Sequence, residues 1–188
     1  MRIIAGTWRG RPLVAPKGTE TRPTADRTRE ALFSMLVSRL GSFEGLRVLD
    51  LFAGSGALGL EALSRGAGHC TFVEQDGAAL DALRTNIAKL GAGPSSDVRA
   101  GSVMTLGPAP APYDLLLLDP PYRTGAGVVA LERCARLGWL APGAIATVET
   151  QKGEAVTVEG FEVETERVYG KAMVTLLRYG LTDQPKAD

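Results

Sequence analysis

The sequence Leu115-Leu116-Leu117-Leu118-Asp119-Pro120-Pro121-Tyr122 joins an apolar run to a stiff turn. The four leucines form a run of the length expected for a buried strand. Two consecutive prolines cannot continue a sheet or lie deep in a helix, so the chain leaves the strand in an extended turn. The turn places a carboxylate, a proline carbonyl and an aromatic ring at the carboxyl edge of a sheet.

A second turn of this kind occurs earlier in the chain. Asp50-Leu51-Phe52-Ala53-Gly54-Ser55-Gly56 follows another apolar strand and opens a helix, and its glycines let the backbone approach a ligand closely. Gly59 completes a G-x-G-x-x-G spacing, so the pattern alone leaves a dinucleotide open. Glu74 ends the next strand, 18 positions after Gly56, where it can accept hydrogen bonds from ribose hydroxyls. The two turns indicate a cofactor and a planar, amino-bearing substrate over one sheet edge.

The Asp-Pro-Pro-Tyr turn suits chemistry on an exocyclic amine. Such an amine is a poor nucleophile, because its lone pair is conjugated into the ring. The Asp119 carboxylate and the Pro120 carbonyl can accept its two N–H bonds at about 3 Å. A pyramidal nitrogen then directs its lone pair at an electrophilic methyl group, and Tyr122 can stack on the base. Alignment and charge stabilisation are expected to do most of the catalysis.

From Leu46 the pattern alternates between strands and helices, which predicts a parallel sheet. The expected strands are 46–51, 70–74, a short one near Val98, 115–118 and 145–149, and the expected helices are 57–65, 78–90 and 128–137. The tail alternates like two antiparallel strands, 161–168 and 173–179.

The segment before Leu46 predicts a hairpin and a helix. Residues 2–4 and 12–14 are expected to pair, and Thr24 is expected to cap a helix that starts near Ala25 and ends at Gly41. Phe33, Leu36, Val37 and Leu40 are expected on one face of that helix. We expect three parts: a hairpin extension over 1–23, a catalytic domain over 24–181 and a disordered tail over 182–188.

Composition is that of a soluble globular protein, with 45% hydrophobic and 22% charged residues among 188. We expect no membrane span and no signal peptide, because no apolar run is long enough. Cys70 and Cys134 are predicted to be reduced core residues of a cytoplasmic protein. With His69 as the single histidine, a histidine-rich zinc site is excluded and we expect no metal.

The formal net charge of zero hides an asymmetry. Residues 1–47 carry nine Lys or Arg against four Asp or Glu, and the rest of the chain carries twelve against seventeen. A basic N-terminal segment on an acidic body indicates a face that meets a polyanion, although a solvated basic surface would look the same.

The glycine turn and the Asp-Pro-Pro-Tyr turn resemble those of class I S-adenosylmethionine-dependent methyltransferases that modify exocyclic amines. The resemblance is closer to one family, the RsmD-type 16S rRNA (guanine-N2)-methyltransferases. Its evidence is Arg2-Ile3-Ile4-Ala5-Gly6-x-Trp8-Arg9-Gly10-Arg11, Arg22-Pro23-Thr24-x-Asp26-Arg27-x-Arg29-Glu30, the turn at 50–61, and Arg167-Val168-Tyr169-Gly170. The N-terminal motifs point to the family, whereas the two turns identify only the superfamily.

The resemblance implies an α/β fold: a Rossmann-like three-layer sandwich with a mostly parallel seven-stranded sheet, antiparallel C-terminal strands and a small N-terminal β-hairpin. It implies methyl transfer from S-adenosyl-L-methionine to N2 of one guanine in 16S rRNA, within the small ribosomal subunit or an assembly intermediate, by a cytoplasmic enzyme expected to be a monomer. Where relatives often carry an acidic residue near the cofactor adenine, this chain has Ser102.

The resemblance and the residues together give a site hypothesis. The expected catalytic residues are Asp119, Pro120 and Tyr122. The expected cofactor-binding residues are Asp50, Phe52, Gly54, Gly56, Glu74, Gln75, Ser102, Val103, Asp119, Arg22 and Thr24. The expected RNA-binding residues are Arg9, Arg11, Arg27, Arg29, Trp8, Tyr169 and Lys171. Arg22 and Arg27 could serve either ligand, and Trp8 could instead pack on the domain.

Other functions remain open at this level. An amino methyltransferase could act on adenine N6 in nucleic acid or on a protein glutamine, and Asp119 does not separate these. A non-catalytic RNA-binding assembly factor could keep the fold, although Asp119, Gly54 and Gly56 argue against it. A nicotinamide dehydrogenase would give no account of the Asp-Pro-Pro-Tyr turn.

Overall fold

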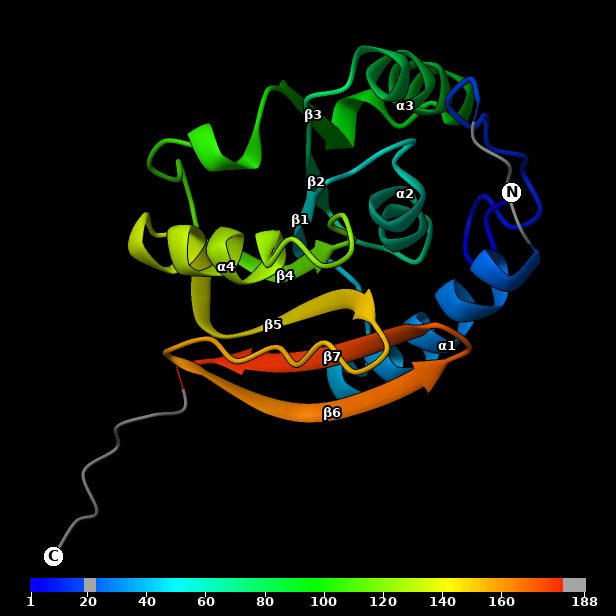
Figure 1. Cartoon of the computed structure of the whole chain (residues 1–188). Coiled ribbons are helices and arrows are strands. Elements are labelled where there is room, and N and C mark those ends of the chain that lie inside the picture. The colour runs from blue at the N-terminus through cyan, green and yellow to red at the C-terminus, as the bar shows by residue number, and fades with distance from the viewer. Residues whose placement is uncertain (19–22, 181–188) are drawn as a thin grey trace, which may run out of the picture. The chain divides into compact units, whose positions relative to one another are not determined.

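The computed structural model describes residues 1–18 and 23–180, which form two compact units (Figure 1). The first unit spans Met1–Val103 and the second begins at Met104. Each unit contains parallel strands whose connecting segments include a helix.

The first unit alternates helices and strands. Its elements are α1 (Pro23–Leu40), β1 (Arg47–Leu51), α2 (Ala57–Ser64), β2 (His69–Glu74), α3 (Gly77–Leu90) and β3 (Ser96–Ala100). The three strands are parallel in the order β3-β2-β1, because each crossover contains a helix. Leu51 lies beside Val73 and Glu74 beside Ala100, so the carboxyl ends of the three strands share one edge.

The core of the first unit lies between the strands and the helices that follow them. Helix α2 packs on β1 and β2. Leu49, Phe72, Leu60 and Leu83 are fully buried, as expected for strands covered by apolar helix faces.

The N-terminal segment, residues 1–18, folds back on itself more loosely than a two-stranded hairpin. A single antiparallel bridge joins Arg2 and Pro12, and backbone bonds run from Ile3 N–H to Arg11 O and from Leu13 N–H to Met1 O. The expected pairing of residues 2–4 with 12–14 is present only in a shifted and looser form, in which residues 1–3 lie opposite residues 10–13. No regular strand forms in this described segment.

Helix α1 differs from expectation at two points. It begins at Pro23, so Thr24 lies in its first turn and is not its cap. Val37 is 40% exposed, whereas Leu32 is buried beside Phe33 and Leu36. The residues expected on one face of the helix are therefore not buried alike, because Phe33 and Leu36 are buried and Val37 is exposed.

The second unit contains β4 (Tyr113–Leu118), α4 (Ala126–Arg136), β5 (Leu140–Gln151), β6 (Phe161–Tyr169) and β7 (Ala172–Tyr179). Its strand order is β4-β5-β7-β6. Strands β4 and β5 are parallel, and β7 is antiparallel to both β5 and β6. The tail is thus the antiparallel pair that the sequence predicts.

Apolar residues of β4, β5 and β7 form the core of the second unit. Leu115 to Leu118 are all buried, as are Ala146 and Val148 of β5. The Trp139 and Tyr113 rings are 5.5 Å apart, and the Trp139 indole N–H donates to the Gly107 carbonyl at 2.9 Å. This bond satisfies the polar edge of a fully buried indole.

Several smaller expectations can be compared directly. The expected strands and helices after Leu46 are all present, with ends shifted by a few residues. Cys70 and Cys134 are free and buried, and burial raises the pKa of the Cys134 thiol to about 12. The expected disordered tail at 182–188 lies outside the described residues. No helix in the described part of the chain is long and apolar enough to cross a membrane.

Candidate active site

The glycine turn at 50–56 has a backbone that only some residues can adopt. Gly54 has φ +57° and Gly56 φ +84°. A Cβ atom at Gly56 would lie 2.4 Å from Leu83, so that glycine is required for close packing of α3. A Cβ atom at Gly54 would meet nothing within 4 Å. The backbone of the turn is thus open at Gly54 and closely packed at Gly56.

Phe52 is one of two non-glycine residues with positive φ among the described residues, at +58°. Such a conformation is costly for an aromatic residue and persists only where the surroundings enforce it. The positive φ of Phe52 turns the chain sharply between the end of β1 and the glycines.

Glu74 braces this turn from the end of β2. One carboxylate oxygen accepts the Gly54 N–H at 2.7 Å, and the other accepts the N–H groups of Gln75 and Asp76 at 2.9 Å each. Glu74 is half-buried. Since each carboxylate oxygen has two lone pairs, acceptor capacity remains on the oxygen that binds Gly54. The side chain is thereby held at the edge where β1 and β2 both end.

Asp50 is buried inside the first unit and bonds the helix that follows the turn. Its side chain is 1% exposed, and its Oδ2 accepts the Gly59 N–H of α2 at 2.9 Å. This bond satisfies a free amide of the first helical turn. The geometry gives Asp50 a role in shaping the turn.

The other expected cofactor residues are more scattered. Gln75 is exposed after β2, Ser102 is half-buried after β3, and Val103 is buried. All three follow carboxyl ends of parallel strands, at the same edge as Glu74. Arg22 lies outside the described residues, as does the side chain of Thr24.

The Asp-Pro-Pro-Tyr turn follows β4 in the second unit. Asp119 is solvent-accessible, yet many protein atoms surround its carboxyl group. This burial, together with the Glu149 carboxylate, raises the pKa of Asp119 to about 7. Leu118 lies beside Val148 in the parallel register. Asp119 and Glu149 are the next residues of these two segments, so they lie near each other toward the carboxyl ends of β4 and β5. Asp119 is therefore more basic than an ordinary aspartate.

Tyr122 is fixed to the same strand end. Its hydroxyl donates to Glu149 Oε1 at 2.7 Å, while the residue is 43% exposed. Burial of the phenol, this hydrogen bond and the charges of Glu149, Asp119 and Glu154 raise the pKa of Tyr122, which stays protonated. An exposed ring held by its hydroxyl is available for stacking.

Hydrogen bonds to the end of β5 and the loop beyond it fix the rest of this turn. The Arg123 side chain donates to Gln151, and the Arg123 N–H donates to Glu154 at 3.2 Å. Arg123 has φ +59°, the second such non-glycine residue among those described. Pro120 is buried, close to where a Cβ atom at Gly127 of α4 would lie. The turn is thus held by packing at Pro120 and by hydrogen bonds at Arg123.

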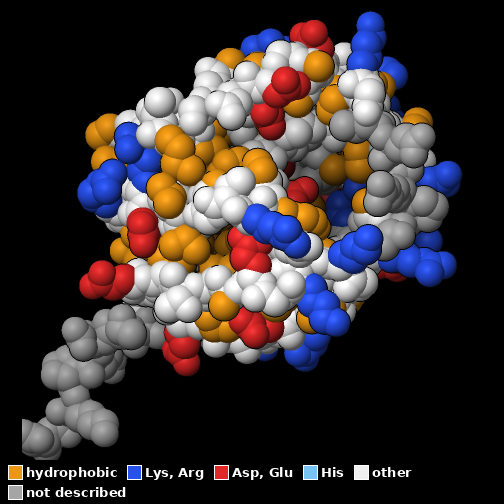
Figure 2. Space-filling view, viewed as in Figure 1, with side chains coloured by type: hydrophobic (Ala, Val, Ile, Leu, Met, Phe, Trp, Pro, Cys, Tyr) orange, Lys and Arg blue, Asp and Glu red, His pale blue; other side chains and the backbone are white. Residues whose placement is uncertain are grey.

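Basic side chains gather around the N-terminal segment, which Figure 1 colours dark blue, as Figure 2 shows. Arg9, Arg11 and Arg27 are exposed, as the RNA-binding hypothesis requires. The Arg11 guanidinium also donates to the Lys89 carbonyl at 2.5 Å, which ties the segment to α3. A cleft of about 350 Å³ lies here, lined by Arg2, Ile3, Ile4, Arg9, Gly10, Asp26, Arg27 and Glu30.

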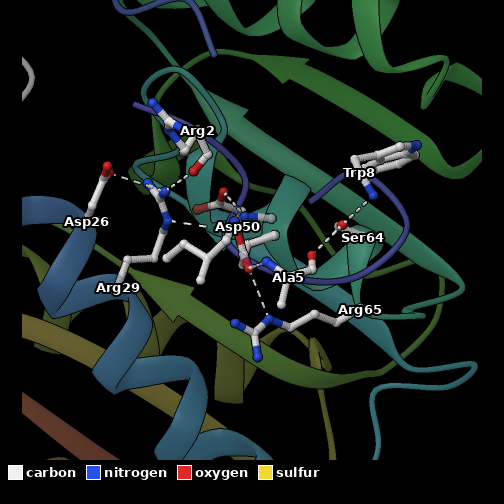
Figure 3. A network of polar contacts seen from close by, with 11 residues as sticks. Arg2, Ala5, Trp8, Asp26, Arg29, Asp50, Ser64 and Arg65 are labelled. Atoms are coloured by element: carbon white, nitrogen blue, oxygen red, sulfur yellow. Dashed lines mark hydrogen bonds and ion pairs between the residues drawn. The ribbon is translucent and has the colours of Figure 1, made fainter. Parts of the chain in front are cut away.

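Arg29 does not lie on that surface. It is 5% exposed, donates to the Arg2 carbonyl and forms an ion pair with Asp26 at 3.3 Å (Figure 3). Burial lowers the pKa of Arg29, and the charges of Asp26 and Glu61 oppose this effect. The predicted contact of Arg29 with phosphate is at odds with this burial.

The remaining expected RNA contacts are in two places. Trp8 is half-buried. Its backbone N–H donates to Ser64 Oγ at 3.0 Å, which fixes the backbone beside the ring (Figure 3). Tyr169 is half-buried and Lys171 is exposed, at the turn between β6 and β7 in the second unit. None of these positions is closed to a ligand.

Three polar residues that sequence reasoning missed hold these segments. Glu61 in α2 is fully buried and accepts the N–H groups of Ile4 and Ala5 at 2.9 and 3.0 Å. Asn86 in α3 forms hydrogen bonds with the Val14 backbone, and Glu149 in β5 accepts one from the Tyr122 hydroxyl. A carboxylate inside the apolar sequence of α2 was one available signal, and Glu149 at the carboxyl end of a parallel strand was another.

The sequence matches known proteins along nearly its whole length. A family model, conserved hypothetical protein 95, matches residues 1–178. Ribosomal RNA small subunit methyltransferase D of Escherichia coli is 36% identical over 190 residues, covering all of this chain and 94% of the relative. The protein of the same name from Haemophilus influenzae is 37% identical over 90% of this chain and 89% of its own length. The chain belongs to this family.

Solved structures agree with the family and with the fold. The structure of yhhF from Escherichia coli superposes with a TM-score of 0.85 at 38% identity, covering 96% of this chain and 98% of that one. A magnesium protoporphyrin IX methyltransferase from Synechocystis with bound S-adenosylmethionine superposes at 0.65 and 15% identity, over 87% of each chain, which bears on the fold alone. The predicted class I, Rossmann-like methyltransferase fold, with seven strands and an antiparallel C-terminal pair, is confirmed.

The first unit of this family member fits S-adenosylmethionine in the chemistry of its residues. An open backbone at Gly54 leaves room for the methionine part, and the Glu74 carboxylate suits ribose hydroxyls. No group of three or more His, Cys, Asp or Glu in the described residues could hold a metal ion.

Proposed function

We propose that this protein transfers a methyl group from S-adenosylmethionine to the exocyclic N2 amine of a guanine in 16S rRNA of the small ribosomal subunit. The proposal also takes the protein to act as a monomer in the cytoplasm, on the subunit or an assembly intermediate. The observation that carries it is the Asp-Pro-Pro-Tyr turn at the end of β4, in which an accessible Asp119 carboxyl is followed by a buried proline and by an exposed tyrosine that Glu149 holds.

Each residue of the Asp-Pro-Pro-Tyr turn has a defined task in this proposal. The Asp119 carboxylate and the Pro120 carbonyl accept the two N–H bonds of the amine, and the Tyr122 ring stacks on the base. When bound, S-adenosylmethionine supplies a methyl group on a positively charged sulfur. Asp119 offsets the positive charge that develops on the nitrogen, and with its raised pKa it can take up the proton that the nitrogen releases near neutral pH.

The cofactor is assigned to the first unit. Gly54 and Gly56 would lie against its methionine part, Glu74 would hold the ribose, and Gln75, Ser102 and Val103 would lie toward the adenine. Phe52 and Asp50 keep the turn in its shape. The Ser102 hydroxyl can form a hydrogen bond with an amino group without carrying a charge.

The basic N-terminal segment is assigned to the RNA. Arg9, Arg11 and Arg27 are exposed cations that can neutralise phosphates, which makes binding depend on salt. Trp8, Tyr169 and Lys171 are secondary candidates for contact with RNA. A base inside a stack cannot reach the Asp-Pro-Pro-Tyr turn, so we expect the target guanine to be extruded.

The test is methyl transfer with tritiated S-adenosylmethionine. Unmethylated small subunits, naked 16S rRNA and DNA are offered in parallel, and the labelled nucleoside is identified after digestion. Label in N2-methylguanosine from subunits supports the proposal. Label in N6-methyladenosine keeps the chemistry and rejects the substrate, and absence of label with bound cofactor favours a protein target or an assembly factor.

A variant pair assigns the reaction to the turn. Asp119→Ala is expected to abolish transfer while cofactor binding stays mostly intact. Glu132→Ala, at an exposed position of α4 in the same unit, is the matched control and should behave as wild type. Full turnover by Asp119→Ala would reject the role of that carboxylate.

A further inference from the structure

Glu149, near the carboxyl end of β5, has no role in the mechanism proposed for the Asp-Pro-Pro-Tyr turn. Glu149 is half-buried, and its Oε1 accepts the Tyr122 hydroxyl at 2.7 Å. The parallel register, in which Leu118 lies beside Val148, brings Glu149 to the same strand end as Asp119. One side chain therefore touches one member of the Asp-Pro-Pro-Tyr turn and lies close to another.

We infer that Glu149 is a positioning residue for methyl transfer, which fixes the Tyr122 ring through its hydroxyl and makes Asp119 a better proton acceptor. The inference rests on the proposed function and deepens it. It assigns to Glu149 two effects, one on geometry and one on charge, and these can be separated by substitution.

The geometric effect follows from the single hydrogen bond. A tyrosine that is 43% exposed would otherwise rotate freely about its side-chain bonds. A charged hydrogen bond to Glu149 selects one ring orientation, as a stacking platform requires. Arg123 supports the same arrangement from the next position, through Gln151 of β5 and through Glu154.

The charge effect concerns the proton that the reaction must release. The amine nitrogen forms a bond to the methyl carbon, the carbon–sulfur bond breaks, and its electron pair stays on sulfur. The nitrogen then carries a positive charge, which it loses by giving one N–H proton to the Asp119 carboxylate. A neighbouring negative charge makes that carboxylate more basic, as the raised pKa of Asp119 indicates.

Three carboxylates of the second unit, and the Arg123 side chain beside them, carry charge near the Asp-Pro-Pro-Tyr turn. Glu149 lies beside Asp119, and the charges of Glu149, Asp119 and Glu154 all act on Tyr122. Tyr122 stays protonated, since these influences and burial raise its pKa. The raised pKa of Asp119, about 7, places its titration near neutral pH.

The test compares Glu149→Gln with Tyr122→Phe in pH profiles of kcat. Glu149→Gln keeps an acceptor for the tyrosine and removes the charge, so the acid limb of the profile should move to lower pH. Tyr122→Phe keeps the ring and removes the hydrogen bond, so kcat should fall about tenfold with the acid limb nearly unmoved. KM for S-adenosylmethionine should stay unchanged in both.

Glu132→Gln, which removes an exposed carboxylate in α4, is the control and should reproduce the wild-type profile. A Glu149→Gln profile that superimposes on wild type would overturn the charge effect. A Tyr122→Phe variant with wild-type kcat would overturn the positioning effect.

A second measurement needs no substrate. The Asp119 carboxyl is titrated by NMR in protein labelled with ¹³C at aspartate side-chain carbons, for wild type and for Glu149→Gln. A lower pKa in the variant supports the pair, and an identical pKa rejects it whatever the activity. If the pKa moves while wild-type protein methylates no substrate, the proposed function fails and the catalytic role of Glu149 falls with it, leaving only the electrostatic pair.

Discussion

Asn86 and Val14 are joined by two hydrogen bonds that run in opposite directions. The Val14 N–H donates to Asn86 Oδ1 at 2.7 Å, and Asn86 Nδ2 donates to the Val14 carbonyl at 2.9 Å. The same amide nitrogen also donates to the Ser55 carbonyl at 3.0 Å. A fully buried side chain of α3 thus connects the N-terminal segment with the glycine turn.

Replacement of Asn86 by leucine should destabilise the protein. The change leaves the polar backbone groups of Val14 and the Ser55 carbonyl without these partners, which should lower the free energy of unfolding by about 3 kcal/mol. Urea denaturation measures the effect. Thr85→Ala, at the exposed neighbouring position of α3, is the control and should change stability by less than about 0.5 kcal/mol. Equal stabilities of the two variants would contradict the prediction.

Gly6 and Gly10 form a matched pair in the N-terminal segment. Both have positive φ, +88° and +80°. A Cβ atom at Gly6 would lie 1.9 Å from the Ser64 carbonyl oxygen, whereas one at Gly10 would meet nothing within 4 Å. Gly10→Ala should cost about 1 kcal/mol, and Gly6→Ala about 3 kcal/mol or displacement of the segment. Thermal unfolding and limited proteolysis of the segment measure this, and similar losses in both variants would contradict it.

Gly54 and Gly56 make the corresponding pair for the cofactor. Gly54→Ala meets open space and should reduce stability by only about 1 kcal/mol, yet reduce affinity for S-adenosylmethionine about tenfold or more, since the new methyl group would occupy the cofactor's position. Gly56→Ala overlaps Leu83 and should mainly reduce stability. Calorimetric titration and urea denaturation separate the two effects. Wild-type affinity in Gly54→Ala would move the cofactor away from that residue.

Asp119 should make stability depend on pH. Its folded-state pKa of about 7 lies above the ordinary value of 3.8, so the folded state holds this proton more tightly than the unfolded state does. The resulting stabilisation is complete below about pH 4 and is lost as the pH rises through 7. Asp119→Asn should therefore gain stability relative to wild type between pH 4 and 8. Urea midpoints at several pH values measure this, and a constant difference would contradict it.

Arg9 and Arg27 should contribute to the salt dependence of RNA binding. Each is exposed, and removal of a phosphate contact lowers the slope of log affinity against log salt by about 1. Arg9→Ala with Arg27→Ala should therefore bind more weakly and with a flatter slope. Arg84→Ala with Arg136→Ala removes two exposed arginines elsewhere and is the control. An unchanged slope in the first pair would remove those arginines from the RNA-binding face.

The residues that end strands were predictable from sequence because their chemistry is local. Asp119 directly follows the apolar strand β4, and Glu74 ends β2, where the carboxyl ends of the parallel strands of its own unit meet. Arg29 could not be placed in the same way. It lies in a basic motif with Arg27, but two residues along helix α1 rotate a side chain by about 200°, so Arg27 faces solvent and Arg29 faces Glu61.

The sequence by itself determined the class of fold, the two turns and the family, because strand length, helix periodicity and the demands of proline and glycine act over a few residues. The tertiary structure alone decided which polar groups hold those turns. Asn86 meets Val14 across 72 positions, and Glu149 meets Tyr122 across 27. Such pairs depend on how the chain packs, since a buried polar group must find a partner wherever the fold places one.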